Sequence, residues 1–238
     1  MKQRLISWFH QDARVATCND WKHLKLIIFD FDGTIADTFD VGFTIFNELA
    51  EELGCRQVEH TEISRMRTMH TLELLRYMRI PITRMGYIAR RGCEELSARI
   101  DSIQPFVGAS QALHALHAHG YRLGIITSNL GSNVSRFLCN HDLEIFEFVQ
   151  GSSKILGKAR EIRAVLRKLK LHPAEVLLVG DETRDVETAK TAGIPVASIS
   201  WGYAARPSLE AMCPNVLIDD LEQLVSVLTC GGEPLLPH

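Results

Sequence analysis

Short apolar runs of strand length recur along the chain, and helical patterns separate most of them. The apolar runs cover residues 26–29, 123–127, 146–149, 176–179, 195–199 and 216–218. Apolar residues recur at the spacing of amphipathic helices over residues 109–119, 134–138, 159–169, 186–192 and 221–228. Strands that are apolar on both faces and alternate with helices are typical of a parallel sheet covered on both sides. The pattern therefore predicts an α/β fold with a doubly wound, Rossmann-like parallel sheet.

Residues 37–104 interrupt this alternation, because they contain several helical patterns and no strand-like run. An apolar residue at every fourth position from 41 to 53 predicts one helix, and Gly54 provides its stop. Shorter helical patterns follow over residues 63–78, and a further helix is predicted over residues 88–100. We therefore expect a small all-helical domain inserted after the first strand.

The insertion divides the chain into three parts. Residues 24–36 and 105–238 together are expected to form the sheet domain, and residues 37–104 the helical domain. Residues 1–23 are polar with isolated aromatic side chains and precede the first strand. The sequence indicates no role for this extension.

Composition narrows the class of protein. A hydrophobic content of 46% and a charged content of 23% are ordinary for a globular protein. The net charge of −3 argues against nucleic acid or an anionic membrane as a partner. The six cysteines are scattered without a C-x-x-C pair, which suits a reducing compartment and indicates no zinc site. The N-terminus lacks the apolar region of a signal peptide, and no stretch approaches the ~18 apolar residues of a membrane span. We expect a cytoplasmic protein.

Polar residues follow three of the predicted strands. They are Asp30 and Asp32 after the first, Thr127, Ser128 and Asn129 after the second, and Asp181 and Asp185 after the fourth. Ligands bind at the carboxyl edge of an open parallel sheet, so these groups are expected to lie together. A local alternative for the first pair is a helix N-cap followed by an Asp-Gly turn.

Carboxylates that meet at this edge require a cation. A like-charge pair ~4 Å apart costs roughly 4 kcal/mol at an effective dielectric near 20. Asp30, Asp32 and Asp181 would form an oxygen-rich site suited to Mg²⁺. Lys158, at the start of the helix predicted over residues 159–169, would supply a positive charge. Lys154 is the alternative candidate for this role. A metal, a lysine, a hydroxyl and a spare carboxylate together suit phosphoryl transfer.

Four motifs in this order resemble those of haloacid-dehalogenase-like (HAD) phosphatases. They are Asp30-Phe31-Asp32-Gly33-Thr34, Ile125 to Asn129, Lys158, and Gly180-Asp181 through Asp185. The helical insertion stands where that family has its C1 cap. The chain is most similar to the phosphoglycolate-phosphatase-like branch, also through residues 105–108 and 200–203. The third motif departs from the family's common lysine-proline pattern, because Ala159 follows Lys158.

The resemblance implies a role for each motif residue. Asp30 would be the nucleophile that forms an aspartyl-phosphate, and Asp32 the general acid and then base. Mg²⁺ would be bound by Asp30, the backbone carbonyl of Asp32 and Asp181. Thr127, Ser128, Asn129 and Lys158 would bind the phosphoryl group. Asp185 would support the metal site through water or Lys158. The implied protein is a monomer or homodimer that hydrolyses a small phosphorylated metabolite, with 2-phosphoglycolate as the first candidate.

Two other functions are compatible with the same motifs. A sugar-phosphate mutase would use Asp32 to help return the phosphoryl group to a rebound intermediate, and a catalytically idle binding protein would keep only the fold. Asp32 argues against a haloacid dehalogenase, which needs no leaving-group acid. The insertion has no lysine, which argues against a phosphonoacetaldehyde-hydrolase-type Schiff base. One or two of its arginines could meet an anionic group, from the set Arg65, Arg67, Arg76, Arg84, Arg90 and Arg91.

Overall fold

A parallel sheet forms the centre of the structure, a computed structural model that describes residues 21–151 and 157–229. The strands within these ranges are β1 (Leu26–Phe29), β2 (Arg122–Thr127), β3 (Phe148–Gly151), β4 (Val176–Gly180), β5 (Val196–Ile199) and β6 (Val216–Ile218). Their order in the sheet is β3-β2-β1-β4-β5-β6, and all neighbouring pairs are parallel. The predicted doubly wound sheet is confirmed.

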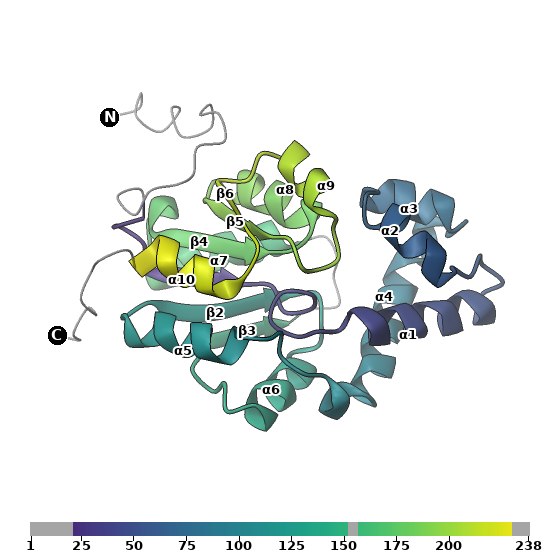
Figure 1. The fold of residues 1–238 in the computed structure, drawn as a ribbon, viewed down its shortest axis with the longest axis horizontal. Helices are drawn as coiled ribbons and strands as arrows, with labels where there is room; N and C mark the ends of the chain where they lie inside the picture. The colour runs from purple at the N-terminus through teal and green to yellow at the C-terminus, as the bar shows by residue number, and fades with distance from the viewer. Residues whose placement is uncertain (1–20, 152–156, 230–238) are drawn as a thin grey trace.

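Helices cover both faces of the sheet (Figure 1). They are α5 (Ala109–Ala118), α6 (Gly131–Asn140), α7 (Lys158–Leu169), α8 (Thr183–Ala192), α9 (Arg206–Ala211) and α10 (Leu221–Thr229). Ile27 and Phe29 face one layer, where they share a core with residues of α5, α6 and α10. Leu26 and Ile28 face the other, with residues of α7 and α8. Burial on both faces explains why β1 is apolar at every position.

Further helices lie between β1 and α5 and gather to one side of the sheet in Figure 1. They are α1 (Phe39–Glu52), α2 (Ile63–Met66), α3 (Thr71–Tyr77) and α4 (Met85–Ser97), and we call residues 39–97 the helical block. Single 3₁₀ turns occur at His60–Glu62, Ile82–Arg84, Ile100–Ser102 and Pro173–Glu175. The block has a small core of its own around Val58, Met78 and Ile80.

Two adjacent segments connect the helical block to the sheet. The Asp37 N–H donates to the Gln104 carbonyl at 2.9 Å, and the Phe106 N–H donates to the Ile35 carbonyl at 3.0 Å. The chain therefore leaves the carboxyl end of β1 and returns beside the same point. This arrangement agrees with an inserted helical unit, although the predicted boundaries at residues 37 and 104 stay a prediction.

Several predicted element bounds need correction. Strand β3 begins at Phe148 rather than at residue 146, and the last helix of the insertion ends at Ser97, so residue 100 lies in a 3₁₀ turn. Helix α8 begins at Thr183 rather than 186, because Glu182 and Asp185 form a capping box that starts the helix earlier. Helix α9 was not predicted; it has only six residues and begins with a proline in its first turn.

Trp21 stands in the predicted N-terminal extension, of which residues 1–20 lie outside the described residues. It is 2% exposed and belongs to the core on the α5 side of the sheet. The described end of this segment thus packs as part of the sheet domain. Among the helices in the described part of the chain, none has the length and apolar character needed to cross a membrane.

The core predicts a large effect of Phe137→Ala on stability. Phe137 is fully buried on α6 and packs edge-on against Phe31, with ring centroids 5.0 Å apart. Its truncation leaves a cavity, so we expect the free energy of unfolding to fall by about 3–5 kcal/mol. Urea unfolding measures this change. Leu72→Ala is the control, because Leu72 is 55% exposed, and it should change stability by less than about 0.5 kcal/mol. Equal losses in both variants would contradict this packing.

Candidate active site

The order of the strands places a topological switch point between β1 and β4. From β1 the chain continues to β2 on one side, whereas from β4 it continues to β5 on the other. Such a switch point leaves room for a ligand beyond the carboxyl ends of the two strands. Phe29 pairs with Val179, so Asp30 follows β1 at the level of Gly180, the last residue of β4. Asp30 and Asp181 therefore both stand at this switch point.

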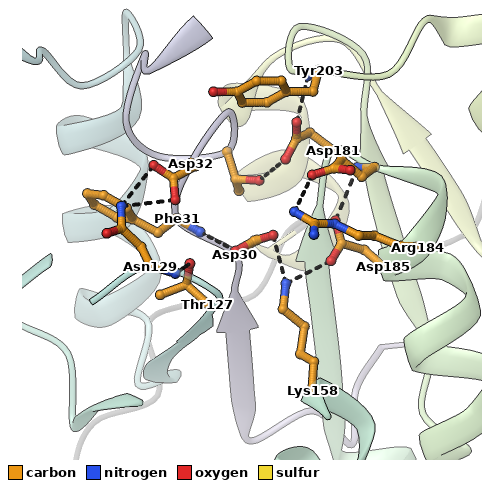
Figure 2. A network of polar contacts seen from close by, with 12 residues as sticks. Asp30, Phe31, Asp32, Thr127, Asn129, Lys158, Asp181, Arg184, Asp185 and Tyr203 are labelled. Carbon is orange, nitrogen blue, oxygen red and sulfur yellow. Dashed lines mark hydrogen bonds and ion pairs between the residues drawn. The ribbon is translucent and has the colours of Figure 1, made fainter. Parts of the chain in front are cut away.

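Asp30 is held from two sides (Figure 2). It is 2% exposed, and its Oδ1 accepts the N–H of Phe31 at 2.8 Å. Its Oδ2 lies 2.7 Å from Nζ of Lys158, the first residue of α7. The same Nζ donates to Oδ1 of Asp185 on α8 at 2.8 Å. One ammonium group thus bridges two buried carboxylates.

The charges around Asp30 and Lys158 determine whether each of these side chains carries a proton. Burial opposes the ionisation of Asp30, but the positive charges of Lys158 and Arg184 outweigh it and hold the pKa of Asp30 below its usual range. Burial likewise disfavours a charged Lys158, yet the carboxylates of Asp185 and Asp30 raise its pKa above the ordinary value. Asp30 is therefore ionised and Lys158 is positively charged near neutral pH.

Asp181 is fully buried at the end of β4, and both of its oxygens accept hydrogen bonds. Thr34 Oγ1 donates to Oδ1 at 2.8 Å, and the Tyr203 N–H donates to Oδ2 at 2.6 Å. Burial and the charges of Glu182, Asp185 and Asp30 raise the pKa of Asp181 well above its usual value. The carboxylate is thus held in a fixed orientation within a negative environment, which a bound cation would stabilise.

Three carboxylates, those of Asp30, Asp181 and Asp185, are placed to bind a divalent cation, and we call them the carboxylate cluster. Ligand oxygens of Asp30, Asp181 and Asp185 all lie within 4.8 Å of one another, and all three residues are buried. Hard oxygen donors of this kind suit Mg²⁺. The Asp32 carboxylate is not in this group, so its predicted part in the site rests on its backbone carbonyl and stays a prediction. Asp185 was predicted to support the site through water or Lys158; its Oδ1 accepts from Lys158 Nζ at 2.8 Å, and its part in metal binding stays a prediction.

Asp32 faces away from the cluster (Figure 2). Nδ2 of Asn129 donates to both of its oxygens at 3.1 Å. Burial and the charge of Asp30 raise the pKa of Asp32 to about 7. Asp30 and Asp32 are only two residues apart, but their surroundings give them opposite protonation tendencies. Asp32 is suited to hold and release a proton near neutral pH.

Asn129 is oriented by a chain of hydrogen bonds that begins in the helical block. Ser97 Oγ donates to Oδ1 of Asn133 at 2.6 Å, and Nδ2 of Asn133 donates to Oδ1 of Asn129 at 2.9 Å. The Leu130 N–H also donates to that oxygen, at 2.7 Å. The oxygen of the Asn129 amide is therefore occupied, and its NH₂ group faces Asp32.

The other predicted phosphate ligands lie at the end of β2. Thr127 is buried, and its Oγ1 accepts the N–H of Asn129 at 3.1 Å, which shapes the turn after the strand. Ser128 is half-buried, and its carbonyl accepts the thiol of Cys93 from α4 at 3.6 Å. The structure thus brings Thr127, Ser128 and Asn129 to the same edge as Asp30, as expected from the sequence.

Gly33 is required by the turn that follows Asp32. Its φ is +75°, and a Cβ at this position would lie 2.4 Å from Oδ2 of Asp181 and from the ring of Tyr203. A side chain here would collide with the carboxylate and adopt a strained backbone conformation. The glycine therefore allows the β1 turn to pass directly beside Asp181.

Several residues at the site were not predicted from the sequence. Glu182 and Arg184 form an ion pair beside the carboxylate cluster, and Thr34, Asn133 and Tyr203 orient the acidic residues. Glu182 and Arg184 lie inside the fourth motif, and Thr34 ends the first. Their places in these motifs were the signal from which the sequence could have assigned them to the site. Asn133 follows Asn129 by one helical turn, which alone indicates little. Lys154, the rival of Lys158, lies outside the described residues.

The arginines of the helical block have different surroundings. Arg65 is exposed, with its guanidinium over the ring of Tyr77. Arg90 and Arg91 pair with glutamates of their own helix. Arg67 donates hydrogen bonds to the carbonyls of Gly202 and Tyr203. The expected contact of one of them with an anionic ligand stays a prediction.

Comparison with known proteins gives consistent matches. The family model described as "Haloacid dehalogenase-like hydrolase" matches residues 27–199. A phosphoglycolate phosphatase of Synechococcus elongatus is 30% identical over 207 residues, which are 87% of this chain and 98% of that protein. A plasmid-encoded phosphoglycolate phosphatase of Cupriavidus necator is 25% identical over 85% of this chain and 92% of its own length.

Solved structures support the fold. A predicted phosphatase from Clostridium acetobutylicum matches with a TM-score of 0.72 and 18% identity, over 85% of this chain and 97% of its own. CbbY from Rhodobacter sphaeroides, solved in complex with phosphate, matches with a TM-score of 0.65 and 22% identity, over 84% of this chain and 96% of its own.

The carboxylate cluster predicts stabilisation by Mg²⁺. A cation that binds only the folded state adds about 2.7 kcal/mol at a hundredfold excess over its Kd, so Tm should rise by several degrees relative to EDTA. Asp181→Asn should remove this Mg²⁺-dependent rise, because it removes one charged ligand. Asp40→Asn is the control, since Asp40 is exposed on α1 and should leave the rise intact. A thermal melt measures each value, and an unchanged rise in Asp181→Asn would refute the assignment.

Proposed function

Since the chain belongs to the haloacid dehalogenase-like hydrolase family, we propose that it is a Mg²⁺-dependent phosphatase of small phosphomonoesters. The observation that carries this proposal is that two carboxylates only two residues apart have opposite protonation tendencies. Asp30 is ionised beside Lys158 at the carboxylate cluster, and Asp32 has a pKa of about 7. One is suited to attack phosphorus, and the other to transfer a proton.

In the first half-reaction, the Asp30 carboxylate attacks the phosphorus of the substrate. The bond between phosphorus and the leaving oxygen breaks, and the leaving alkoxide takes a proton from Asp32. Asp30 then carries the phosphoryl group as an aspartyl-phosphate. Lys158, 2.7 Å from Asp30 Oδ2, is placed to offset negative charge on the transferred oxygens.

In the second half-reaction, Asp32 is the base. It takes a proton from a water molecule that attacks the same phosphorus, the bond to Asp30 breaks, and inorganic phosphate leaves. Asn129 holds the Asp32 carboxylate by two hydrogen bonds of 3.1 Å, which fixes it in place for both transfers. Both catalytic carboxylates are thereby restored for the next cycle.

The metal and the second strand would assist the nucleophile. Asp30, Asp181 and the Asp32 carbonyl would hold Mg²⁺, with Asp185 beside them. When bound, Mg²⁺ supplies positive charge that offsets the repulsion between a carboxylate and a phosphate. Thr127 and Ser128 would bind phosphoryl oxygens from the end of β2. Asn129 is engaged with Asp32, so its main part would be to orient the acid.

We propose 2-phosphoglycolate as the first substrate to test, in a cytoplasmic enzyme. The similar proteins of Synechococcus elongatus and Cupriavidus necator bear the name phosphoglycolate phosphatase, which supports this choice. The free thiols of Cys55, Cys93, Cys139 and Cys213 support a reducing compartment.

We expect release of inorganic phosphate from 2-phosphoglycolate with Mg²⁺ and without any added hexose bisphosphate. Asp30→Asn should lower kcat about a thousandfold or more, because the amide is a poor nucleophile. The exposed Asp40→Asn should retain activity. A strict requirement for a hexose 1,6-bisphosphate would instead indicate a mutase, and full activity in Asp30→Asn would exclude the proposed mechanism. A phosphate-release assay over a panel of phosphorylated metabolites decides among these outcomes.

Asp32→Asn should affect substrates according to their leaving group. A poor leaving group, such as the alkoxide of 2-phosphoglycolate, needs a proton, so its aspartyl-phosphate formation should slow by about 10²–10⁴-fold. p-Nitrophenolate leaves without a proton, so the same step with p-nitrophenyl phosphate should slow much less. Single-turnover kinetics separates this step from the later hydrolysis. Equal losses for both substrates would contradict the role of Asp32 as the acid.

A further inference from the structure

The helical block contacts the sheet domain at a loop separate from its two chain connections. This loop, residues 200–205, follows β5. Arg67, which lies between α2 and α3, donates from Nη2 to the Gly202 carbonyl at 2.6 Å and from Nε to the Tyr203 carbonyl at 3.3 Å. Its own carbonyl accepts the N–H of Ala205 at 2.7 Å. One residue of the helical block thus makes hydrogen bonds with three residues of the loop.

The same loop holds Asp181. The Tyr203 N–H donates to Oδ2 of Asp181 at 2.6 Å, and the Ala204 N–H donates to the Asp181 carbonyl at 3.3 Å. A Cβ on Gly202 would lie 2.2 Å from the Cβ of Asp181, so the loop backbone packs directly on this residue. A displaced loop must therefore either move the carboxylate or break its hydrogen bond.

Tyr203 ties the loop to the start of the helical block (Figure 2 shows its ring above Asp181). Its hydroxyl donates to the Thr38 carbonyl at 3.2 Å and lies 3.1 Å from Thr38 Oγ1. Its ring lies 5.2 Å from that of Phe39, and the Arg67 guanidinium lies 5.8 Å above the Phe39 ring. Phe39, Arg67 and Tyr203 thus form one contact around the loop.

We propose that Arg67 is a positioning residue for Asp181, so that the helical block sets the Mg²⁺ affinity of the site through loop 200–205. The inference rests on the metal site proposed above. Arg67 reaches no metal ligand itself. It acts through two backbone carbonyls, and the Gly202 carbonyl belongs to the same peptide group as the Tyr203 N–H, which orients the Asp181 carboxylate.

The chemistry of Arg67 makes this link specific. Its planar guanidinium donates to the carbonyls of Gly202 and Tyr203 at once, which fixes the orientation of the Gly202–Tyr203 peptide group. A lysine could contact one carbonyl at a time and would hold that peptide less firmly. Outer residues that orient metal ligands typically contribute about 10–100-fold to metal affinity.

Calorimetric titration of the metal-free full chain with MgCl₂, without substrate, tests the proposal. The variants are Arg67→Gln, Arg67→Lys and the control Arg65→Gln, which changes an exposed arginine on α2, two residues before Arg67. We expect Arg67→Gln to raise the Kd for Mg²⁺ about tenfold or more. Arg67→Lys should raise it less, and Arg65→Gln should leave it unchanged. At saturating Mg²⁺, Arg67→Gln should recover most of the wild-type kcat.

The outcomes separate this inference from the proposed function. Equal Kd values in wild type and Arg67→Gln, or an equal loss in Arg65→Gln, would overturn the role of Arg67 while leaving the metal site intact. No detectable Mg²⁺ binding by the wild type would overturn the metal site itself. Circular dichroism verifies that each variant folds. If Arg67→Gln does not fold, Arg67→Lys carries the comparison, and a wild-type Kd in that variant counts against the proposal.

Discussion

The repulsion among buried carboxylates at the end of β1 and β4 is the constraint on which the site depends. Asp30, Asp181 and Asp185 place ligand oxygens within 4.8 Å of one another. At such a distance, repulsion between two ionised carboxylates costs roughly 4 kcal/mol at an effective dielectric near 20. Lys158 offsets part of this repulsion through its two ion pairs. Backbone N–H groups on three loops bind further carboxylate oxygens. The fold can concentrate this charge because parallel strands end together at the switch point.

The different surroundings of Asp30 and Asp32, on which their proposed roles rest, follow from a turn. In an extended strand, residues two apart share a side, and the two carboxylates would converge on one ligand. Here the chain folds back after Asp30, and the Phe31 carbonyl accepts the N–H groups of Ile35 and Ala36. Asp32 consequently faces the Asn129 amide instead of the carboxylate cluster. A tight turn thus gives two neighbouring residues different partners and different protonation states.

Local patterns were sufficient to predict the sheet and most residues at its carboxyl edge. Strand β1 is apolar throughout, and Asp30, Thr127 and Asp181 interrupt or follow such runs where a buried strand gains nothing from them. Contacts between distant segments could not be predicted in this way. Thr34 meets Asp181, and Ser97 meets Asn133, only after the strands pair and the helical block returns. The early start of α8 depends on a capping box of Glu182 and Asp185, and of these two only Asp185 was predicted from the sequence to support the metal site.

The arginines of the helical block show why sequence position alone does not assign a function. An arginine in a proposed cap suggests an anionic ligand, yet the Arg67 guanidinium binds two backbone carbonyls of the sheet domain. The peptide group that contains the first of these carbonyls, that of Gly202, also contains the Tyr203 N–H, which donates to Asp181. The helical block and the carboxylate cluster are therefore connected through the backbone of one loop, whereas Ser97 and Asn133 connect the block to Asp32. Because hydrogen bonds from the block reach the surroundings of both Asp181 and Asp32, we expect its position to influence metal binding and proton transfer at the proposed site.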